Sequence, residues 1–161
     1  MEDHNSIVAA LQAAGWKQRA LGGFIDTAGP LWTRKEEAGF AYGILVEERH
    51  LNPGAIVHGG MLGTLMDHAI STVAWQACER APCITVQLDT HFVGAVKSGE
   101  FAQARAEVAH RTRGLIFMRG SVKVQGLLVV SAQAVLKVMA PVQAGKMAAP
   151  VSMPHDPRAT P

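Results

Sequence analysis

The chain has 161 residues, of which 48% are hydrophobic and 17% are charged, and its formal net charge is only +2. This length and composition predict one well-buried or oligomeric globular domain and exclude a disordered chain. Nucleic-acid binding is disfavoured because basic runs with interleaved aromatic residues are absent, and no segment of about 18 apolar residues predicts a membrane span.

The N-terminal third predicts a short helix and then a pair of strands. Its first residues are too acidic for a signal peptide, so we expect a cytoplasmic protein with no membrane partner. Apolar residues recur at helical spacing over residues 4–15, and Gly15 predicts the end of that helix. Extended segments at residues 30–35 and 39–47 flank a charged turn and predict a hairpin.

A long amphipathic helix is predicted over residues 59–76. Its apolar stripe, which includes Leu65 and Met66, should face a core. A second strip, beside the first, is made of small residues and one carboxylate: Gly60, Gly63, Thr64, Asp67, Ser71 and Ala74. A glycine inside a helix costs about 1 kcal/mol relative to alanine, so this strip predicts close approach of a ligand to the helix.

The same helix begins at a His58-Gly59-Gly60 elbow. The first N–H groups of a helix have no partner within the helix and lie at the positive end of its dipole. The amides of Gly59 and Gly60 are therefore placed to stabilise a developing oxyanion.

After Pro82 the hydrophobic period changes from helical to two. Residues 84–93 alternate as a strand, with Thr85 and His91 expected on one face. Three further strands are predicted at residues 101–110, 115–125 and 127–139, and they should pair as an antiparallel meander. Proline-rich residues 141–161 have no period and are predicted to be disordered.

Together these elements predict an α+β fold in which one large antiparallel sheet wraps around a single long helix. Residues 1–23 would form a helical lead-in, and residues 24–140 the main domain. Apolar sheet edges and faces would be left for a dimer to cover. Cys78 and Cys83 lack metal-ligand or CxxC spacing, so neither a metal nor a redox site is expected.

The segment from Arg49 to Ala69 carries Asn52-Pro53, the His58-Gly59-Gly60 elbow, and Asp67 nine residues after His58. It resembles the hotdog-fold acyl-CoA thioesterases of the phenylacetate-pathway and 4-hydroxybenzoyl-CoA type, over about residues 24–140. The resemblance implies a hotdog fold and hydrolysis of an acyl-CoA, with no cofactor because coenzyme A is part of the substrate. It also implies a homodimer or a dimer of dimers, a homotetramer, with active sites shared between subunits.

The resemblance further implies the catalytic residues. Asp67 would act as general base or nucleophile, and the Gly59 N–H as oxyanion donor. His58 and Asn52 would orient the thioester or water, and Thr85 would position water. Whether Asp67 attacks carbon directly or activates water stays open.

Substrate contacts are expected around this catalytic group. The pocket would accept an aromatic or a medium-chain aliphatic acyl group. The nucleotide end of coenzyme A would lie near basic surface residues. The expected substrate-binding residues are Gly60, Met61, Ser71, His91, Arg111 and Arg113.

Two other functions fit the same scaffold: a non-catalytic acyl-CoA-binding module and a hotdog-type enoyl-CoA hydratase. The carboxylate at Asp67 disfavours the binding module, and the spacing from His58 to Asp67 disfavours the hydratase.

Overall fold

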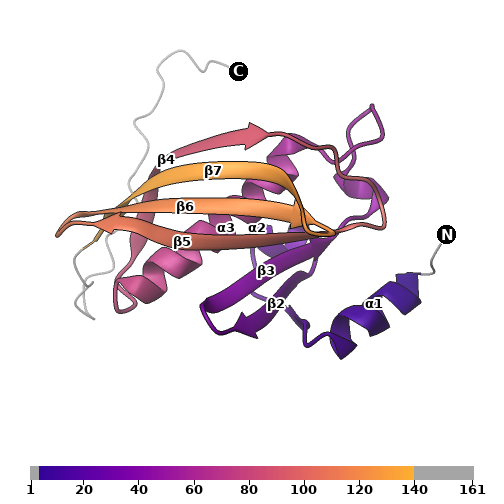
Figure 1. Ribbon diagram of the computed structural model, residues 1–161, viewed down its shortest axis with the longest axis horizontal. Coiled ribbons are helices and arrows are strands. Elements are labelled where there is room, and N and C mark those ends of the chain that lie inside the picture. Colours follow the sequence, from indigo (N-terminus) through magenta and orange to yellow (C-terminus); the bar gives the residue numbers. More distant parts are fainter. Residues whose placement is uncertain (1–3, 140–161) are drawn as a thin grey trace, which may run out of the picture.

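The computed structural model describes residues 4–139, so the predicted disordered segment 141–161 lies outside the described residues. Within this range one antiparallel sheet curves around one long helix, as Figure 1 shows. The predicted α+β hotdog architecture is confirmed.

The helical elements are α1 (His4–Ala13), α2 (Phe24–Thr27), the 3-10 helix η1 (Glu48–His50) and α3 (Gly59–Ala77). The strands are β1 (Lys17–Arg19), β2 (Leu31–Glu36), β3 (Gly39–Leu45), β4 (Cys83–Phe92), β5 (Phe101–Arg111), β6 (Leu115–Val124) and β7 (Leu127–Val138). Of these, β1, α2 and η1 are too short to leave a periodic signal in the sequence. None of the described helices is both long and apolar enough to cross a bilayer.

The seven strands lie in the order β1-β2-β3-β5-β6-β7-β4. The predicted hairpin is β2 and β3, and the predicted meander is β5, β6 and β7. The chain enters α3 after β3, returns along β4 at the far edge of the sheet, and then crosses back to β5. This crossover places β4 beside β7, and no strand among residues 4–139 pairs with the other side of β4.

The main core lies between α3 and the concave face of the sheet. On α3 the buried residues are Leu62, Leu65, Met66, Ala69, Ile70 and Ala74, which recur at helical spacing. Gly120 on β6 lies directly against Met66, so a Cβ at that position would overlap the thioether. The helix therefore approaches the sheet closely because the sheet carries a glycine beneath it.

A second, smaller core lies on the other face of β2. Trp32 is fully buried against Trp16 and Ala41, and α1 contributes Val8 and Leu11. Because neighbouring strand residues point to opposite faces, Leu31 enters the main core while Trp32 enters this one. The sheet is thus covered on both faces near β2.

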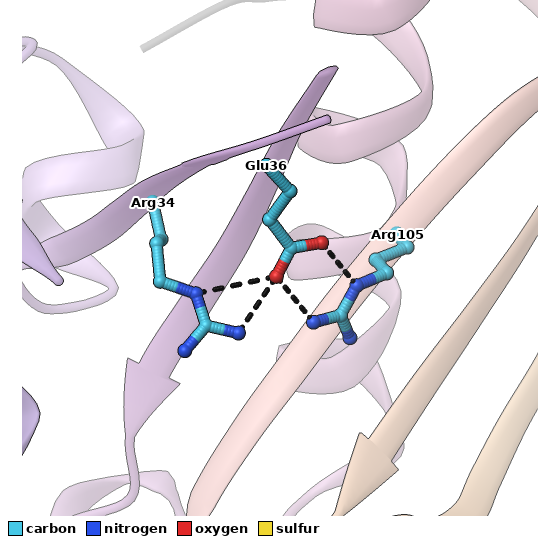
Figure 2. A network of polar contacts seen from close by, with 3 residues as sticks. All are labelled: Arg34, Glu36 and Arg105. Atoms are coloured by element: carbon cyan, nitrogen blue, oxygen red, sulfur yellow. Dashed lines mark hydrogen bonds and ion pairs between the residues drawn. The ribbon is translucent and has the colours of Figure 1, made fainter. Parts of the chain in front are cut away.

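Glu36 joins the end of β2 to β5 across the beginning of β3, as Figure 2 shows. Its carboxylate accepts two hydrogen bonds from Arg105, at 2.7 and 2.8 Å, and two from Arg34, at 2.7 Å from Nη2 and 3.2 Å from Nε. The Arg105 hydrogen bonds are the main reason that the pKa of Glu36 falls to about 2, and Arg34 lowers it further against the opposing effect of burial.

Glu36→Gln is expected to lower the free energy of unfolding at pH 7 by about 1 to 2 kcal/mol, because it leaves two arginines without their carboxylate. The folded-state pKa is depressed, so the charged form stabilises the fold above about pH 4.5 and loses this effect as pH falls toward about 2. Urea unfolding of both proteins across this range should show the difference shrinking. A difference that stays constant down to pH 2 would contradict the ionic origin.

Candidate active site

The beginning of α3 is set by the side chain of His58. His58 has extended backbone angles, and its Nδ1 accepts the Gly60 N–H at 2.9 Å, so it is the N-cap of α3. Its own N–H donates to the carbonyl of His50 at 2.8 Å. The elbow is therefore tied both to the helix that follows it and to the loop that precedes it.

The Gly59 N–H differs from its neighbours in having no acceptor among residues 4–139. It lies at the first position of a 19-residue helix, where the helix dipole is positive. The Phe92 ring is the nearest side chain, 3.3 Å from where a Cβ on Gly59 would be. An incoming carbonyl oxygen could therefore take a hydrogen bond that the chain itself leaves unused.

Asp67 lies two turns further along α3 and is half-buried. Its Oδ1 accepts a hydrogen bond of 2.9 Å from the Thr85 hydroxyl on β4. Ser71 Oγ lies 3.4 Å from the same hydroxyl oxygen. The structure thus brings Thr85 of β4 to Asp67 and Ser71, which the sequence already placed on one strip of α3, and the second carboxylate oxygen of Asp67 accepts no side-chain hydrogen bond within the described residues.

A hollow of about 510 Å³ opens beside Asp67, between α2 and α3. Its lining combines apolar and polar groups: Phe24, Ile25, Gly63, Thr64, Asp67, His68, Ser71 and Leu88. A Cβ placed on Gly63 would meet no atom within 4 Å, so the strip of small residues on α3 is open to a ligand at this position. The carboxylate therefore faces a space with apolar walls that could hold an acyl group.

Sequence reasoning missed four of these lining residues. Phe24 and Ile25 belong to α2, a single turn, and Leu88 was assigned only a strand position. His68 follows Asp67 directly, and that adjacency of two titratable residues was the available signal.

His68 connects the hollow to the interior of the sheet. Its ring stacks edge-on against Tyr42, with centroids 5.5 Å apart, and its Nε2 lies 3.5 Å from Thr72 Oγ1. Burial lowers the pKa of His68, and the negative charge of Asp67 only partly opposes this. The imidazole is therefore expected to be neutral at pH 7 beside the carboxylate.

Gly59 and Asp67 are not close to each other within one chain. Eight residues of helix separate them, which corresponds to about 12 Å along the axis. No single thioester carbonyl can therefore contact both groups of the same protomer.

Asn52 takes part in the turn before the elbow. Its Oδ1 accepts the Gly54 N–H at 2.8 Å, and its own N–H donates to the Ile56 carbonyl, also at 2.8 Å. This is an Asx turn, which shapes the loop leading to His58. The side-chain NH₂ of Asn52 donates no hydrogen bond within the described residues. The predicted role of Asn52 toward the thioester stays a prediction.

A β-bulge in β4 changes the predicted strand faces. The pairing of β4 with β7 shifts register between Thr85 and Gln87. Thr85 points to Asp67 on α3, whereas Asp89 lines a surface hollow on the opposite face, and His91 follows Asp89 at strand spacing. The prediction that Thr85 and His91 share a face is therefore wrong, because the extra residue of the bulge reverses the alternation.

The remaining predicted residues lie around this centre or away from it. Gly60 and Met61 are in the first turn of α3, and the Gly60 N–H is already bonded to His58. Arg111 donates to the Ala77 carbonyl at 2.7 Å and so caps the opposite end of α3, and Arg113 is exposed in the following turn.

The part of the chain that the structure describes offers few metal-ligating side chains close together. No group of three or more histidine, cysteine or acidic side chains there could hold a metal ion. Cys78 and Cys83 are free thiols at the junction of α3 and β4.

Comparison with known proteins agrees with this geometry. The family described as the thioesterase superfamily matches residues 54–131, a range that includes the elbow, Asp67 and Thr85. This segment, just under half of the chain, is similar to the thioesterase superfamily. The matched segment also contains β4, β5 and β6, so it covers both partners of the Asp67–Thr85 hydrogen bond.

Mouse acyl-coenzyme A thioesterase 13 is 36% identical over 73 residues, 45% of this chain and 51% of that enzyme. The match thus spans about half the length of that relative. A Pseudomonas aeruginosa protein named for a proposed esterase activity is 26% identical over 113 residues, 69% of this chain and 84% of the other. A Bacillus halodurans protein solved with CoA superposes with a TM-score of 0.67 at 23% identity, covering 84% of this chain and 90% of the other, which supports the fold.

Proposed function

We propose that the chain is an acyl-CoA thioesterase that hydrolyses an aryl- or medium-chain acyl-CoA to the free acid and coenzyme A. The observation that carries this proposal is the Asp67 carboxylate, held by Thr85 beside an apolar hollow on a thioesterase-superfamily fold. The relatives named as thioesterase and esterase support hydrolysis, and the CoA-bound relatives support a CoA ester as substrate. Coenzyme A is part of the substrate, and no separate cofactor is needed.

In the proposed reaction the thioester carbonyl accepts the Gly59 N–H, which stabilises negative charge on oxygen as the tetrahedral centre forms. Asp67 either removes a proton from an attacking water or attacks the carbonyl carbon itself. In the first route the hydroxide adds to the carbonyl carbon, the C–S bond breaks, and the proton held by Asp67 passes to the departing thiolate. In the second route the C–S bond breaks as an acyl–Asp67 anhydride forms, and water then hydrolyses that anhydride, which releases the acid, regenerates Asp67 and supplies the proton that the thiolate takes up. Thr85 keeps Asp67 oriented and can also hold the water.

Because Gly59 and Asp67 lie too far apart in one protomer, the proposed site combines Gly59 of one chain with Asp67 of another. The free edge of β4 supports such a dimer. Exposed apolar side chains gather along and just beyond this strand, with 54% exposure for Ile84, 65% for Val86, 51% for Phe92 and 59% for Val93. Pairing of two β4 edges would cover them, and we expect the dimers to assemble further into the homotetramer that the resemblance implies.

The other proposed contacts lie outward from this centre. His58 and Asn52 would orient the thioester, and His91, Arg111 and Arg113 would contact the coenzyme A portion, for which the surface exposure of these last three is suitable.

Thiol release from a panel of acyl-CoAs tests the function. We expect hydrolysis of aryl- or medium-chain esters, with specificity steps of about 1 to 3 kcal/mol between acyl groups that differ by one methylene. Tight binding of the esters without thiol release would contradict hydrolysis and favour a binding module. Addition of water to an enoyl-CoA without release of thiol would favour a hydratase.

A further inference from the structure

His50 is a buried histidine that the proposed chemistry does not use. It is 5% exposed, and no other histidine or charged residue of segment 4–139 is buried to this extent. A buried polar group normally has hydrogen-bond partners, because an unpaired one costs about 1 to 3 kcal/mol. The surroundings of His50 are therefore informative.

One ring nitrogen of His50 closes the turn of η1. The Glu47 N–H donates to His50 Nδ1 at 3.0 Å, and the His50 N–H donates back to the Glu47 backbone carbonyl, also at 3.0 Å. The Glu47 side chain takes part in the same capping arrangement and pairs with Arg49 at 3.0 Å. The hydrogen bond that Nδ1 accepts from the Glu47 N–H thus fixes both the η1 turn and the orientation of the imidazole.

The other ring nitrogen faces the segment that follows α2. His50 Nε2 forms no hydrogen bond of good geometry within the described residues, although the Ala28 backbone is close enough to raise the pKa of the ring, and Nε2 lies 3.3 Å from where a Cβ on Gly29 would be. Gly29 has φ of +121° and is buried, so the chain leaves α2 through a residue that accommodates the ring. His50 therefore packs against the exit of the element that carries Phe24 and Ile25.

The backbone of His50 holds the elbow itself. Its carbonyl accepts the His58 N–H at 2.8 Å, and Leu51 forms a bridge with Val57 just inside that contact. Residues 51–57 are thus a closed loop whose two ends meet at His50. The peptide that follows His58 carries the Gly59 N–H, so the direction of that N–H depends on where His50 lies.

Burial is the main cause that lowers the pKa of His50. Arg49 lowers it further, whereas the Ala28 backbone and the Glu47 carboxylate oppose the shift. A neutral imidazole is required if Nδ1 is to accept the Glu47 N–H. The electrostatic surroundings and the hydrogen bond therefore agree.

We propose that His50 is a positioning residue that fixes the direction of the Gly59 N–H by holding η1, the exit of α2 and the elbow at fixed positions. The alignment toward a thioester rests on the proposed function, whereas the mechanical role in the elbow does not. Misplacement of a catalytic group by about 1 Å can reduce a rate by about 100-fold, so a residue outside the hollow can have a large effect.

The test compares His50→Leu with His50→Asn. Leucine fills the space without an acceptor, whereas the asparagine oxygen can take the place of Nδ1. We expect His50→Leu to lower kcat at least about 10-fold with KM changed less than about 3-fold, and His50→Asn to recover at least about a third of kcat. Glu48→Gln, an exposed change in the same turn, is the matched control and should retain the wild-type kcat.

Amide hydrogen exchange, read by mass spectrometry on the full chain, provides a readout that does not need turnover. In His50→Leu, exchange should be faster in peptides covering residues 58–62 and unchanged in those covering residues 66–76. Wild-type kcat and wild-type elbow exchange in a folded His50→Leu protein would overturn the proposal, as would equal kcat values for the two variants. If the leucine variant does not fold, His50→Asn must keep wild-type elbow exchange for the proposal to stand.

If the wild-type chain releases no thiol from any acyl-CoA, the proposed function fails, and the exchange measurement alone then decides whether His50 holds the elbow.

Discussion

Asp67→Asn is expected to reduce kcat for the best acyl-CoA substrate by a factor of more than about 100, which corresponds to about 3 kcal/mol of transition-state stabilisation. Asparagine can neither remove a proton from water nor attack the carbonyl. Its side-chain oxygen can still accept the Thr85 hydroxyl, so the contact between α3 and β4 should survive. Stopped-flow or steady-state thiol release measures the loss.

The melting temperature and circular dichroism of Asp67→Asn should match the wild type. Asp89→Asn is the matched control, because Asp89 is a carboxylate on the same strand as Thr85 but on the face away from α3. It should keep kcat within about threefold. Turnover close to wild type in a folded Asp67→Asn protein would refute the assigned role of Asp67.

Gly59→Pro is expected to lower kcat by about 100- to 1,000-fold, because it removes the proposed oxyanion donor and little else. Proline is tolerated at the first position of a helix, and His58 has φ of −62° and ψ of 129°, which are compatible with a following proline. No hydrogen bond within the described chain uses the Gly59 N–H, so none is lost.

Gly59→Ala is the control for this change. Its Cβ meets the same Phe92 ring, at 3.3 Å, but the N–H remains. Alanine should therefore reproduce any steric effect of proline without the loss of the donor. Equal kcat for the alanine and proline variants would show that the ring contact, and not the N–H, accounts for the defect.

Mixing the two inactive proteins tests the shared site directly. If Gly59 of one chain works with Asp67 of the other, a heterodimer of Asp67→Asn and Gly59→Pro chains contains one site with both wild-type groups. Random subunit exchange should then restore about one quarter of wild-type activity. No recovery despite exchange, checked by native mass spectrometry, would mean that the two groups act within one chain or not at all.

The periodic elements of this protein are readable in the sequence for a local reason. A helix or strand that buries one face must repeat its apolar residues at 3.6 or 2 positions, and α3 and β5 to β7 do so over 10 or more residues each. The elbow is readable as well, since His58 and two glycines before an apolar stripe mark a capped helix start. Gly59 and Asp67 could therefore be chosen as site residues before any coordinates.

Contacts between distant segments have no such local signature. The Thr85–Asp67 hydrogen bond joins β4 to α3, and the bulge that follows Thr85 places His91 on the opposite face, which strand periodicity did not predict. The hollow wall formed by Phe24 and Ile25 comes from a single helical turn, which is too short to show a period. Both features depend on packing between segments that lie far apart in the sequence.

The sequence by itself therefore determined the elements, the elbow and the carboxylate of this protein, because caps, glycines and hydrophobic periods act through neighbours along the chain. Only the tertiary structure decided what surrounds them: β4 at the free edge beside β7, His68 in the hollow, and His50 between α2 and the elbow. The physical reason is that burial and hydrogen bonding depend on which segments meet in space, and pattern along the chain does not specify that meeting.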